Sequence, residues 1–292
     1  MKFGKIHSLG AIKISGQDAH SFLQGQLTND INDLTQNWQF SGYCNPKGRL
    51  LALFQIWRSA DNEVYALLSK DLVDPVIKRL RMYVMRSNVV IEELDQLNIY
   101  GLSSLEYLTE ISPVSFEAIK PDTNNQVFYN GNTALLMIDQ HALLVSEDSY
   151  SDIEVNNFDE RWTQLNVEHG FPQISLDSSE LFIPQMVNLD LLGGISFNKG
   201  CYTGQEIVAR MHYLGKLKQR MFVYAASEKL QGVLAGDKVV RDDTSTAGLI
   251  VSASNDSKMC LAVIKLDSSD EALFLESGLK LEKLSDQPYL LK

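Results

Sequence analysis

Cysteine and histidine are scarce in this sequence, which limits the disulfide and metal chemistry that it can support. Only three of its 292 residues are cysteine, and its five histidines are scattered. Widely spaced cysteines in an odd number, with no CxxC pair, are not typical of a disulfide framework and agree with a reducing compartment. The same spacing argues against a preformed metal or iron–sulfur site within one chain. A cluster shared between two chains through Cys201 stays open.

Long hydrophobic runs and excess positive charge are also absent. No apolar run approaches the roughly 20 residues that a membrane-spanning helix needs. The charged start of the chain is not followed by the apolar stretch of a secretory signal. These absences predict a cytoplasmic protein that does not associate with membranes. The net charge of −11 repels polyanions at long range, so we expect no direct, tight binding to nucleic acid.

The hydrophobic content of 45% supports two or three cores rather than disorder. Apolar periodicity and turn residues predict an α+β first part of the chain. The expected elements are strands at 11–15, 38–43 and 50–57, helices at 18–24 and from Asp74 onward, short strands at 127–129, 134–138 and 142–145, and a helix at 159–169 with Trp162 and Leu165 on one side. The turn at 45–48 should join the strands at 38–43 and 50–57 in a hairpin, and Asp74 should be the N-cap of its helix.

The pattern of predicted secondary structure changes at about residue 221. From there, short strands alternate with turns rich in Gly, Asp and Ser, and helical periodicity disappears. Strands at this spacing are typical of a small β-barrel.

Cys201 is the best candidate for chemistry among the three cysteines. It precedes a helical pattern for which Thr203 is the expected N-cap, and Lys199 is close in sequence. The positive end of a helix and an ammonium group both favour a thiolate, which is the nucleophilic and metal-binding form. A buried structural cysteine is the ordinary alternative, and from the residues alone the two interpretations are about equal. We expect Cys44, beside a turn, and Cys260, in an apolar run, to be packing residues.

The octapeptide KGCYTGQE at residues 199–206 resembles the KGCYxGQE signature of the YgfZ family. The flanking residues 182–197 fit as well, and the segments ISGQD at 14–18 and FLQGQLTND at 22–30 are similar to the family's N-terminal motif. The resemblance extends to about Arg220. It implies a fold shared with the T-protein (aminomethyltransferase) of the glycine cleavage system, with antiparallel sheets, helices and a C-terminal barrel. We expect a split folate-binding domain (1–45 with 105–210), an inserted α+β subdomain (46–104) and a barrel domain (211–292).

The resemblance also implies a cofactor and partners. The cofactor is tetrahydrofolate or a one-carbon derivative, and the partners are folate and iron–sulfur client proteins, including enzymes that methylthiolate tRNA. By this resemblance Trp162 is a folate-associated tryptophan, whose indole offers a flat apolar face to an aromatic ring. A core tryptophan is the alternative.

Several other positions are assigned to the site by the same resemblance. Glu168 aligns with a T-protein glutamate, and a carboxylate there can accept two hydrogen bonds from a pterin edge; a surface helix glutamate is the equal alternative. Leu9 stands where relatives often have a second tryptophan, and leaves an apolar wall. Within the octapeptide, Gln205 is assigned to cofactor binding, and Cys201 with Lys199 and Tyr202 to chemistry.

One departure from the T-protein pattern concerns activity. The T-protein has an acidic pair where this chain has Ala52 and Leu53, so an acid–base or electrostatic partner is missing. The sequence therefore predicts a protein that is not an active aminomethyltransferase. The leading hypothesis is a tetrahydrofolate-binding accessory factor that supports the synthesis or repair of iron–sulfur enzymes and so affects tRNA modification. The alternative is a folate-dependent one-carbon transferase with an unidentified acceptor.

Two stretches without acidic residues stand out against the negative total. Residues 75–91 and 207–227 contain arginine and lysine but no aspartate or glutamate. Such local positive regions suit a polyglutamate tail, a phosphate or an acidic partner surface. A solvated helix face and an interdomain linker are the more ordinary interpretation.

Overall fold

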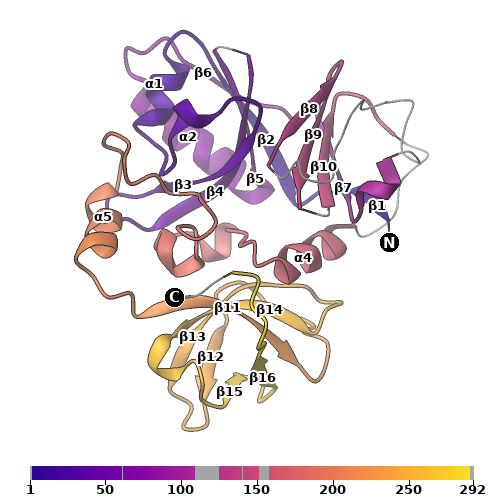
Figure 1. Ribbon diagram of the computed structural model, residues 1–292, viewed down its shortest axis with the longest axis vertical. Helices are drawn as coiled ribbons and strands as arrows, with labels where there is room; N and C mark the ends of the chain where they lie inside the picture. The colour runs from indigo at the N-terminus through magenta and orange to yellow at the C-terminus, as the bar shows by residue number, and fades with distance from the viewer. Residues whose placement is uncertain (1, 61, 109–124, 140, 151–157, 290–292) are drawn as a thin grey trace.

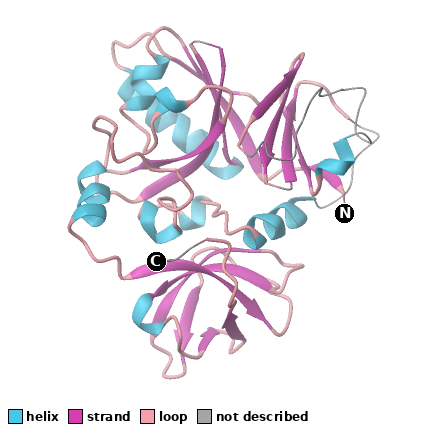
Figure 2. Cartoon of the chain, in the orientation of Figure 1, coloured by secondary structure: helices cyan, strands magenta, loops and turns pink. Residues whose placement is uncertain are grey.

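Two antiparallel sheets and a closed β-barrel make up the protein, with few helices between them (Figures 1 and 2). This computed structural model describes residues 2–60, 62–108, 125–139, 141–150 and 158–289. No helix within those ranges is long and apolar enough to cross a membrane. The predicted α+β class with a C-terminal barrel is confirmed.

The first sheet has five strands and contains most of the N-terminal part of the chain. Its strands in spatial order are β3 (Trp38–Cys44), β4 (Leu50–Ala60), β5 (Glu63–Ser69), β2 (Leu9–Ser15) and β6 (Val90–Glu93). Helices α1 (Ala19–Gln24) and α2 (Val73–Val84) belong to this part of the chain, and α2 packs on β6 and β2. The predicted hairpin of β3 and β4 is confirmed.

The second sheet also has five strands. Its strands in spatial order are β1 (Phe3–Lys5), β7 (Asn98–Leu102), β10 (His141–Ser146), β9 (Thr133–Ile138) and β8 (Val127–Asn130). The Trp38 backbone N–H donates to the Asn125 carbonyl at 2.8 Å, and the Trp38 indole N–H donates to the Met137 carbonyl at 2.7 Å. These bonds fix the start of β3 against the second sheet.

The C-terminal barrel closes with six strands. Around the barrel they follow the order β11 (Gln219–Ala226), β14 (Met259–Lys265), β13 (Thr246–Ala253), β12 (Lys238–Arg241), β15 (Leu273–Leu275) and β16 (Lys280–Lys283). Helix α5 (Gln205–Tyr213) precedes β11 in the chain and lies at the edge of the molecule (Figure 1). Short 3-10 turns complete the elements: η1 (Ile31–Asp33), η2 (Lys70–Leu72), η3 (Leu105–Tyr107), η5 (Leu176–Ser178), η6 (Pro184–Val187) and η7 (Leu266–Ser268).

Helix α4 (Phe158–Glu168) lies between the sheets and the barrel (Figure 1). Its first turn is acidic, which suits the positive end of a helix. The Asp159 carboxylate accepts hydrogen bonds from the backbone N–H groups of His7 and Ser8, at 2.9 and 2.8 Å. The Glu160 carboxylate accepts from Ser254 and Asn255 of the barrel. The helix is therefore fixed on two sides.

Two predicted helix starts are displaced in the structure. Helix α2 begins at Val73 with Leu72 as N-cap, and the Asp74 carboxylate pairs with Lys78 at 2.6 Å instead of capping the helix. Helix α5 has Gly204 rather than Thr203 as its N-cap. The division into three domains stays a prediction. The first sheet includes strands from both sides of its boundary at 45/46, because β3 pairs with β4.

Candidate functional site

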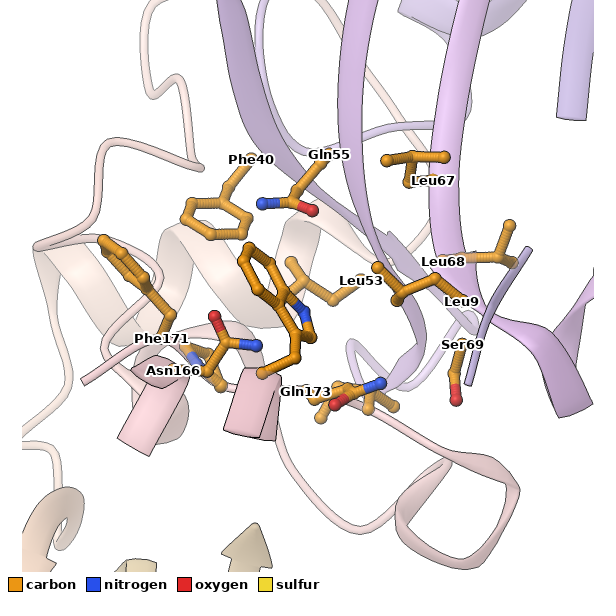
Figure 3. A pocket seen from close by; sticks show the side chains of 13 residues that line it. Leu9, Phe40, Leu53, Gln55, Leu67, Leu68, Ser69, Asn166, Phe171 and Gln173 are labelled. Atoms are coloured by element: carbon orange, nitrogen blue, oxygen red, sulfur yellow. The ribbon is translucent and has the colours of Figure 1, made fainter. Parts of the chain in front are cut away.

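A pocket opens between the first sheet and helix α4 (Figure 3). One wall is a row across three neighbouring strands, because Phe40 on β3 pairs with Gln55 on β4, and Gln55 pairs with Leu67 on β5. Leu53 lies two residues before Gln55 and so faces the same side of the sheet. Leu9 and Ser69, paired across β2 and β5, extend this wall.

The opposite wall comes from α4 and the segment that follows it. Trp162 and Asn166 are four residues apart, which places them on one face of the helix. Phe171 and Gln173 line the pocket from the next segment. The cavity itself has a volume of about 30 Å³, and about 400 Å³ is free of atoms when the open mouth is included. Its complete lining is Leu9, Phe40, Leu53, Gln55, Leu67, Leu68, Ser69, Trp162, Asn166, Phe171, Pro172, Gln173 and Ile174.

Three side-chain amides around this space are free to bind a ligand. Gln55, Asn166 and Gln173 make no side-chain hydrogen bond to any part of the chain that the structure describes. Asn166 is nevertheless only 8% exposed. The pocket therefore presents unused donors and acceptors beside apolar walls.

Trp162 differs from an ordinary core tryptophan in the state of its indole N–H. Its side chain is 1% exposed, yet the N–H makes no hydrogen bond to the described residues. Trp38, which is 2% exposed, donates its N–H to a carbonyl oxygen as buried indoles usually do. Trp162 thus combines the burial of a core residue with a free polar edge in a pocket wall.

The pocket wall has no ionisable side chain among the residues that the structure describes. Leu53 occupies the pocket side of β4, and Ala52 is completely buried on the strand's other face. General acid–base catalysis requires a titratable group within hydrogen-bond reach of the reacting atoms. The described wall can bind and orient a flat polar molecule but supplies no such group.

A buried histidine, His141, packs against the Trp162 ring. The His141 ring is 5.4 Å from the Trp162 ring and 4.6 Å from the His169 ring, measured between centroids. Both of its ring nitrogens are buried without a hydrogen-bond partner among the described residues. Burial, with smaller contributions from His169 and Arg161, lowers the pKa of His141 to about 3. The ring is therefore neutral at physiological pH and supports the indole as a packing group.

A second hollow lies next to the pocket and shares two lining residues with it, Phe40 and Phe171. It is bordered by backbone and side chains of β3, the segment at 191–193, and Asp139. Of the ionisable groups described, only this carboxylate borders it. A negatively charged tail would find no cation there among the described residues. The hollow suits a neutral or weakly polar extension of a ligand.

The KGCYTGQE loop forms a second candidate region, away from the Trp162 pocket. Lys199 is 8% exposed, and its ammonium donates to the carbonyl oxygens of Leu27 and Asn29, both at 2.7 Å. Burial lowers its pKa to about 8, although Asp30 acts in the opposite direction. The ammonium also lies 5.3 Å from the centre of the Tyr202 ring. Lys199 therefore ties the loop to the segment after α1.

Close packing against the β3–β4 turn explains one glycine of this loop. Gly204 has φ +84°, and a Cβ there would lie 2.4 Å from the Asn45 carbonyl oxygen. Gly48 in the turn has φ +71°, and a Cβ there would lie 2.8 Å from Ile207. Each position needs a residue without a side chain. Gly200 has neither a close neighbour nor a positive φ, so this explanation does not apply to it.

Cys201 is the exposed member of the three cysteines. Cys44 and Cys260 are buried, and burial raises the pKa of both thiols to about 12, as expected for the packing residues that the sequence predicts. Tyr202, next to Cys201, is buried, and this raises its pKa. The accessible thiol of the chain is thus the one in the octapeptide.

The sequence-predicted site residues separate into three places. Trp162 and Leu9 line one pocket, whereas Lys199, Cys201, Tyr202 and Gln205 belong to the loop and the first turn of α5. Glu168 does not line the pocket; its carboxylate accepts from Gln164 at 2.8 Å and lies 3.5 Å from Arg161. Its role in folate binding stays a prediction. The described ranges contain no group of three or more side chains suited to hold a metal.

Sequence reasoning missed the three amides and the two phenylalanines of the pocket. Asn166 had a recognisable signal, because it follows Trp162 by four residues in a predicted helix. Gln55 alternates with Leu53 in a predicted strand and therefore shares its face. Phe40, Phe171 and Gln173 had no comparable signal, since they reach the pocket through long-range pairing and packing.

The chain is 32% identical over 227 residues to the tRNA-modifying protein YgfZ of Escherichia coli (strain SE11), covering 73% of this chain and 68% of the relative. The values are the same for the protein of that name from Shigella boydii serotype 18. The chain belongs to the YgfZ family.

No protein-family profile matches this YgfZ-family chain. Among solved structures, it resembles glycine cleavage system aminomethyltransferase T from Bartonella henselae, with a TM-score of 0.69 over 98% of this chain and 85% of that one. At 12% sequence identity this likeness shows the fold alone. The T-protein-like fold expected for a YgfZ-family member is thereby confirmed.

Proposed function

We propose that this protein is a tetrahydrofolate-binding accessory factor that supports the synthesis or repair of iron–sulfur enzymes and thereby affects tRNA modification. The observation that carries the proposal is the uncharged pocket at Trp162, with free amides between apolar walls. The name of the relatives, tRNA-modifying protein, supports the second half of the proposal.

The chemistry of the pocket fits the aromatic part of a folate. A pterin is flat and has amide-like edges, so it needs an apolar contact on its faces and matched donors and acceptors around its rim. Trp162, Phe40 and Leu9 supply the first, and the amides of Gln55, Asn166 and Gln173 supply the second. The hollow beyond Phe40 and Phe171 leaves room for the uncharged aminobenzoyl part of the molecule. Bound tetrahydrofolate would provide a carrier of one-carbon units.

An accessory role agrees better with this pocket than aminomethyl transfer does. The described wall holds no acid or base, and the position of the expected carboxylate is filled by Leu53. Cys201 is the proposed functional thiol, accessible on the octapeptide loop. We assign it the part of the function that involves client proteins, and assign the Trp162 pocket the part that involves folate.

Binding can be tested by titrating the protein with tetrahydrofolate under anaerobic conditions and following tryptophan fluorescence. A variant with Gln55→Ala and Asn166→Ala should bind about tenfold more weakly, since two hydrogen bonds are lost. Gln164→Ala, on the same helix but hydrogen-bonded to Glu168, is the matched control. Equal affinity in the double variant and the wild type would reject the pocket as the folate site.

The cellular role requires a separate test. The wild-type gene should restore methylthiolated tRNA in a bacterium that lacks its own YgfZ-type protein, and Cys201→Ala should fail to do so while folding and binding folate normally. Full rescue by that variant would remove the role assigned to the thiol. Turnover of 5,10-methylene- or 5-formyl-tetrahydrofolate that disappears in Trp162 or Cys201 variants would instead favour the one-carbon transferase.

A further inference from the structure

The C-terminal end of α5 and the segment after it form a surface that the folate pocket does not explain. This surface, called here the α5 surface, consists of Arg210, Tyr213, Leu214, Lys216 and Lys218. All five side chains are exposed, with Tyr213 at 63% and Leu214 at 85%. In Figure 1, α5 lies at the molecular edge, and the chain runs from it to β11 without covering it. The surface thus combines two large exposed apolar side chains with three cations, in a chain of net charge −11.

The three cations of the α5 surface have no counter-ion in the described protein. Arg210, Lys216 and Lys218 form no ion pair or side-chain hydrogen bond with any residue that the structure describes. The nearby Arg220 behaves differently: its guanidinium is bound by Asp190 through two contacts of 2.8 Å. Arg210 also suits the negative end of α5, but Lys216 and Lys218 lie beyond the helix. Their charge is therefore available to a partner.

The apolar part of the surface is held in place before any partner binds. The His212 ring stacks on Phe197 at 3.7 Å between centroids, and Tyr213 packs edge-on against His212 at 4.7 Å. Val208 is fully buried, and its carbonyl accepts a hydrogen bond from the Gln185 amide at 2.7 Å. A fixed aromatic anchor beside arginine is typical of the residues that dominate binding energy in protein interfaces.

A shallow hollow continues the surface toward the barrel. It is lined by Leu217, Lys218, Gln219, Lys265, Leu266 and Asp267. Leu266 is 43% exposed there. Its charged groups are mixed, because Asp267 lies beside Lys218 and Lys265, and the Lys265 ammonium donates to the Thr246 carbonyl at 2.7 Å. The apolar character of the α5 surface thus extends beyond the helix and can contact an extended or helical segment rather than a single side chain.

We propose that the α5 surface docks an acidic segment of a partner protein, with Tyr213 and Leu214 as apolar anchors and the three free cations as its charged contacts. The proposal deepens the accessory role above, on which it rests, because it names the surface by which a client is recognised. Nucleic acid fits less well. The protein as a whole repels a polyanion, three free cations neutralise few phosphates, and an exposed leucine has no use on a phosphate backbone.

The α5 surface lies at a distance from Cys201 that would bring a docked partner close to the exposed thiol. Helix α5 has nine residues and is therefore about 13 Å long. Cys201 precedes its first turn, and Phe197, four residues before Cys201, stacks on His212 at its far end. The loop thus returns along the helix, and a partner held at Tyr213 lies within about one helix length of the exposed thiol.

The test uses labelled peptides and fluorescence anisotropy with the full-length protein. The probes are a peptide in which glutamate alternates with leucine, a peptide of equal length and charge with serine in place of leucine, and a single-stranded RNA of equal charge. The wild type should bind the first probe tightest. A variant with Arg210→Glu, Lys216→Glu and Lys218→Glu should bind it at least about tenfold more weakly, because all three charged contacts are reversed.

Matched controls on the barrel separate local docking from total charge. The variant Lys229→Glu, Lys238→Glu and Lys280→Glu undergoes the same change in net charge and should retain binding within about twofold. Leu214→Ser should weaken binding about tenfold, whereas Leu234→Ser, at a barrel leucine that is 59% exposed, should not.

Four outcomes would overturn the proposal: equal affinity of the wild type and the α5 variant for the first peptide, equal affinity of the wild type for both peptides, tighter binding of the RNA, or no peptide binding at all. Self-association of the wild type that the α5 variant abolishes in sedimentation would overturn it too, in favour of a second copy of this chain. Tetrahydrofolate titrations of the same variants should be unchanged. Failure of the wild type to bind folate would reject the proposed function and leave the docking result standing.

Discussion

The Trp162 pocket and the octapeptide loop differ in almost every physical property. The pocket is enclosed by a sheet and a helix, its described wall is uncharged, and its polar groups are free amides. The loop is on the surface, exposes a thiol, and is held to the segment after α1 by its buried ammonium. The first arrangement suits selective binding of a flat molecule, and the second suits contact with another protein. Two regions of one chain are thus built for different tasks.

Trp162→Ala tests whether the pocket wall is part of the hydrophobic core, and it has the largest expected effect on stability. The indole is fully buried between the first sheet, His141 and α4, so its removal leaves a cavity. The free energy of unfolding should fall by about 3–5 kcal/mol, measured by urea denaturation. A loss below about 1 kcal/mol would show that the pocket is not continuous with the core.

Lys199→Met asks whether the ammonium is a structural group of the loop. The substitution leaves the buried carbonyls of Leu27 and Asn29 without their donor, and the free energy of unfolding should fall by about 1–3 kcal/mol. Lys47→Met, at an exposed lysine in the neighbouring turn, is the control and should change little. Equal stability of the two variants would contradict the structural role.

The buried His141 predicts a pH dependence that belongs to the pocket and not to the loop. Its pKa is about 3 in the folded protein against an ordinary value of 6.5, so the unfolded chain binds the proton first as the pH falls. The free energy of unfolding should therefore decrease below pH 6.5, by up to about 1.4 kcal/mol per pH unit. His141→Leu should flatten this slope in urea titrations at pH 7 and pH 5. The same slope in both proteins would assign the effect to other groups.

Asn166→Ala tests which of two residues near the C-terminal end of α4, Asn166 or Glu168, contacts folate. Asn166 lines the pocket, so its loss should weaken tetrahydrofolate binding about fivefold, or about 1 kcal/mol. Glu168→Gln provides the comparison, because the Glu168 carboxylate interacts with Gln164 and Arg161 instead. If Glu168→Gln lost more affinity for tetrahydrofolate than Asn166→Ala, the Glu168 carboxylate would be a folate contact.

Cys201→Ala should have the smallest effect on stability. An exposed side chain contributes little to the core, so the free energy of unfolding should change by less than about 0.5 kcal/mol. Cellular complementation should nevertheless be lost. If Cys201→Ala were stable and complemented fully, the octapeptide loop would have a structural role only.

Local sequence patterns predicted much of the fold. The period-two strand at 11–15, the hairpin around the turn at 45–48 and the helix containing Trp162 are all present, because each depends on periodicity and turn chemistry within a short segment. The barrel strands β15 and β16 were not predicted. They are three and four residues long, and although they pair with each other, each also pairs with a strand far away in the sequence, β15 with β12 and β16 with β11.

The candidate site was only partly predictable for the same reason. The octapeptide directed attention to Cys201, and the structure confirms that Cys44 and Cys260 are buried. The pocket wall, however, depends on the register that places Phe40, Gln55 and Leu67 in one row across three strands. No short segment contains that information. Lys199 illustrates the same limit, because its two carbonyl acceptors lie about 170 positions earlier in the chain.

The two carboxylates at the start of α4 make this helix a mechanical link. Asp159 is bonded to the turn between β1 and β2, and Glu160 is bonded to the barrel through Ser254 and Asn255. Trp162 and Asn166 are on the same rigid helix, one and two turns further on. A force that tilted the barrel against the sheets would act on α4 and change the width of the pocket. A partner that displaces the barrel would therefore also change the width of the pocket.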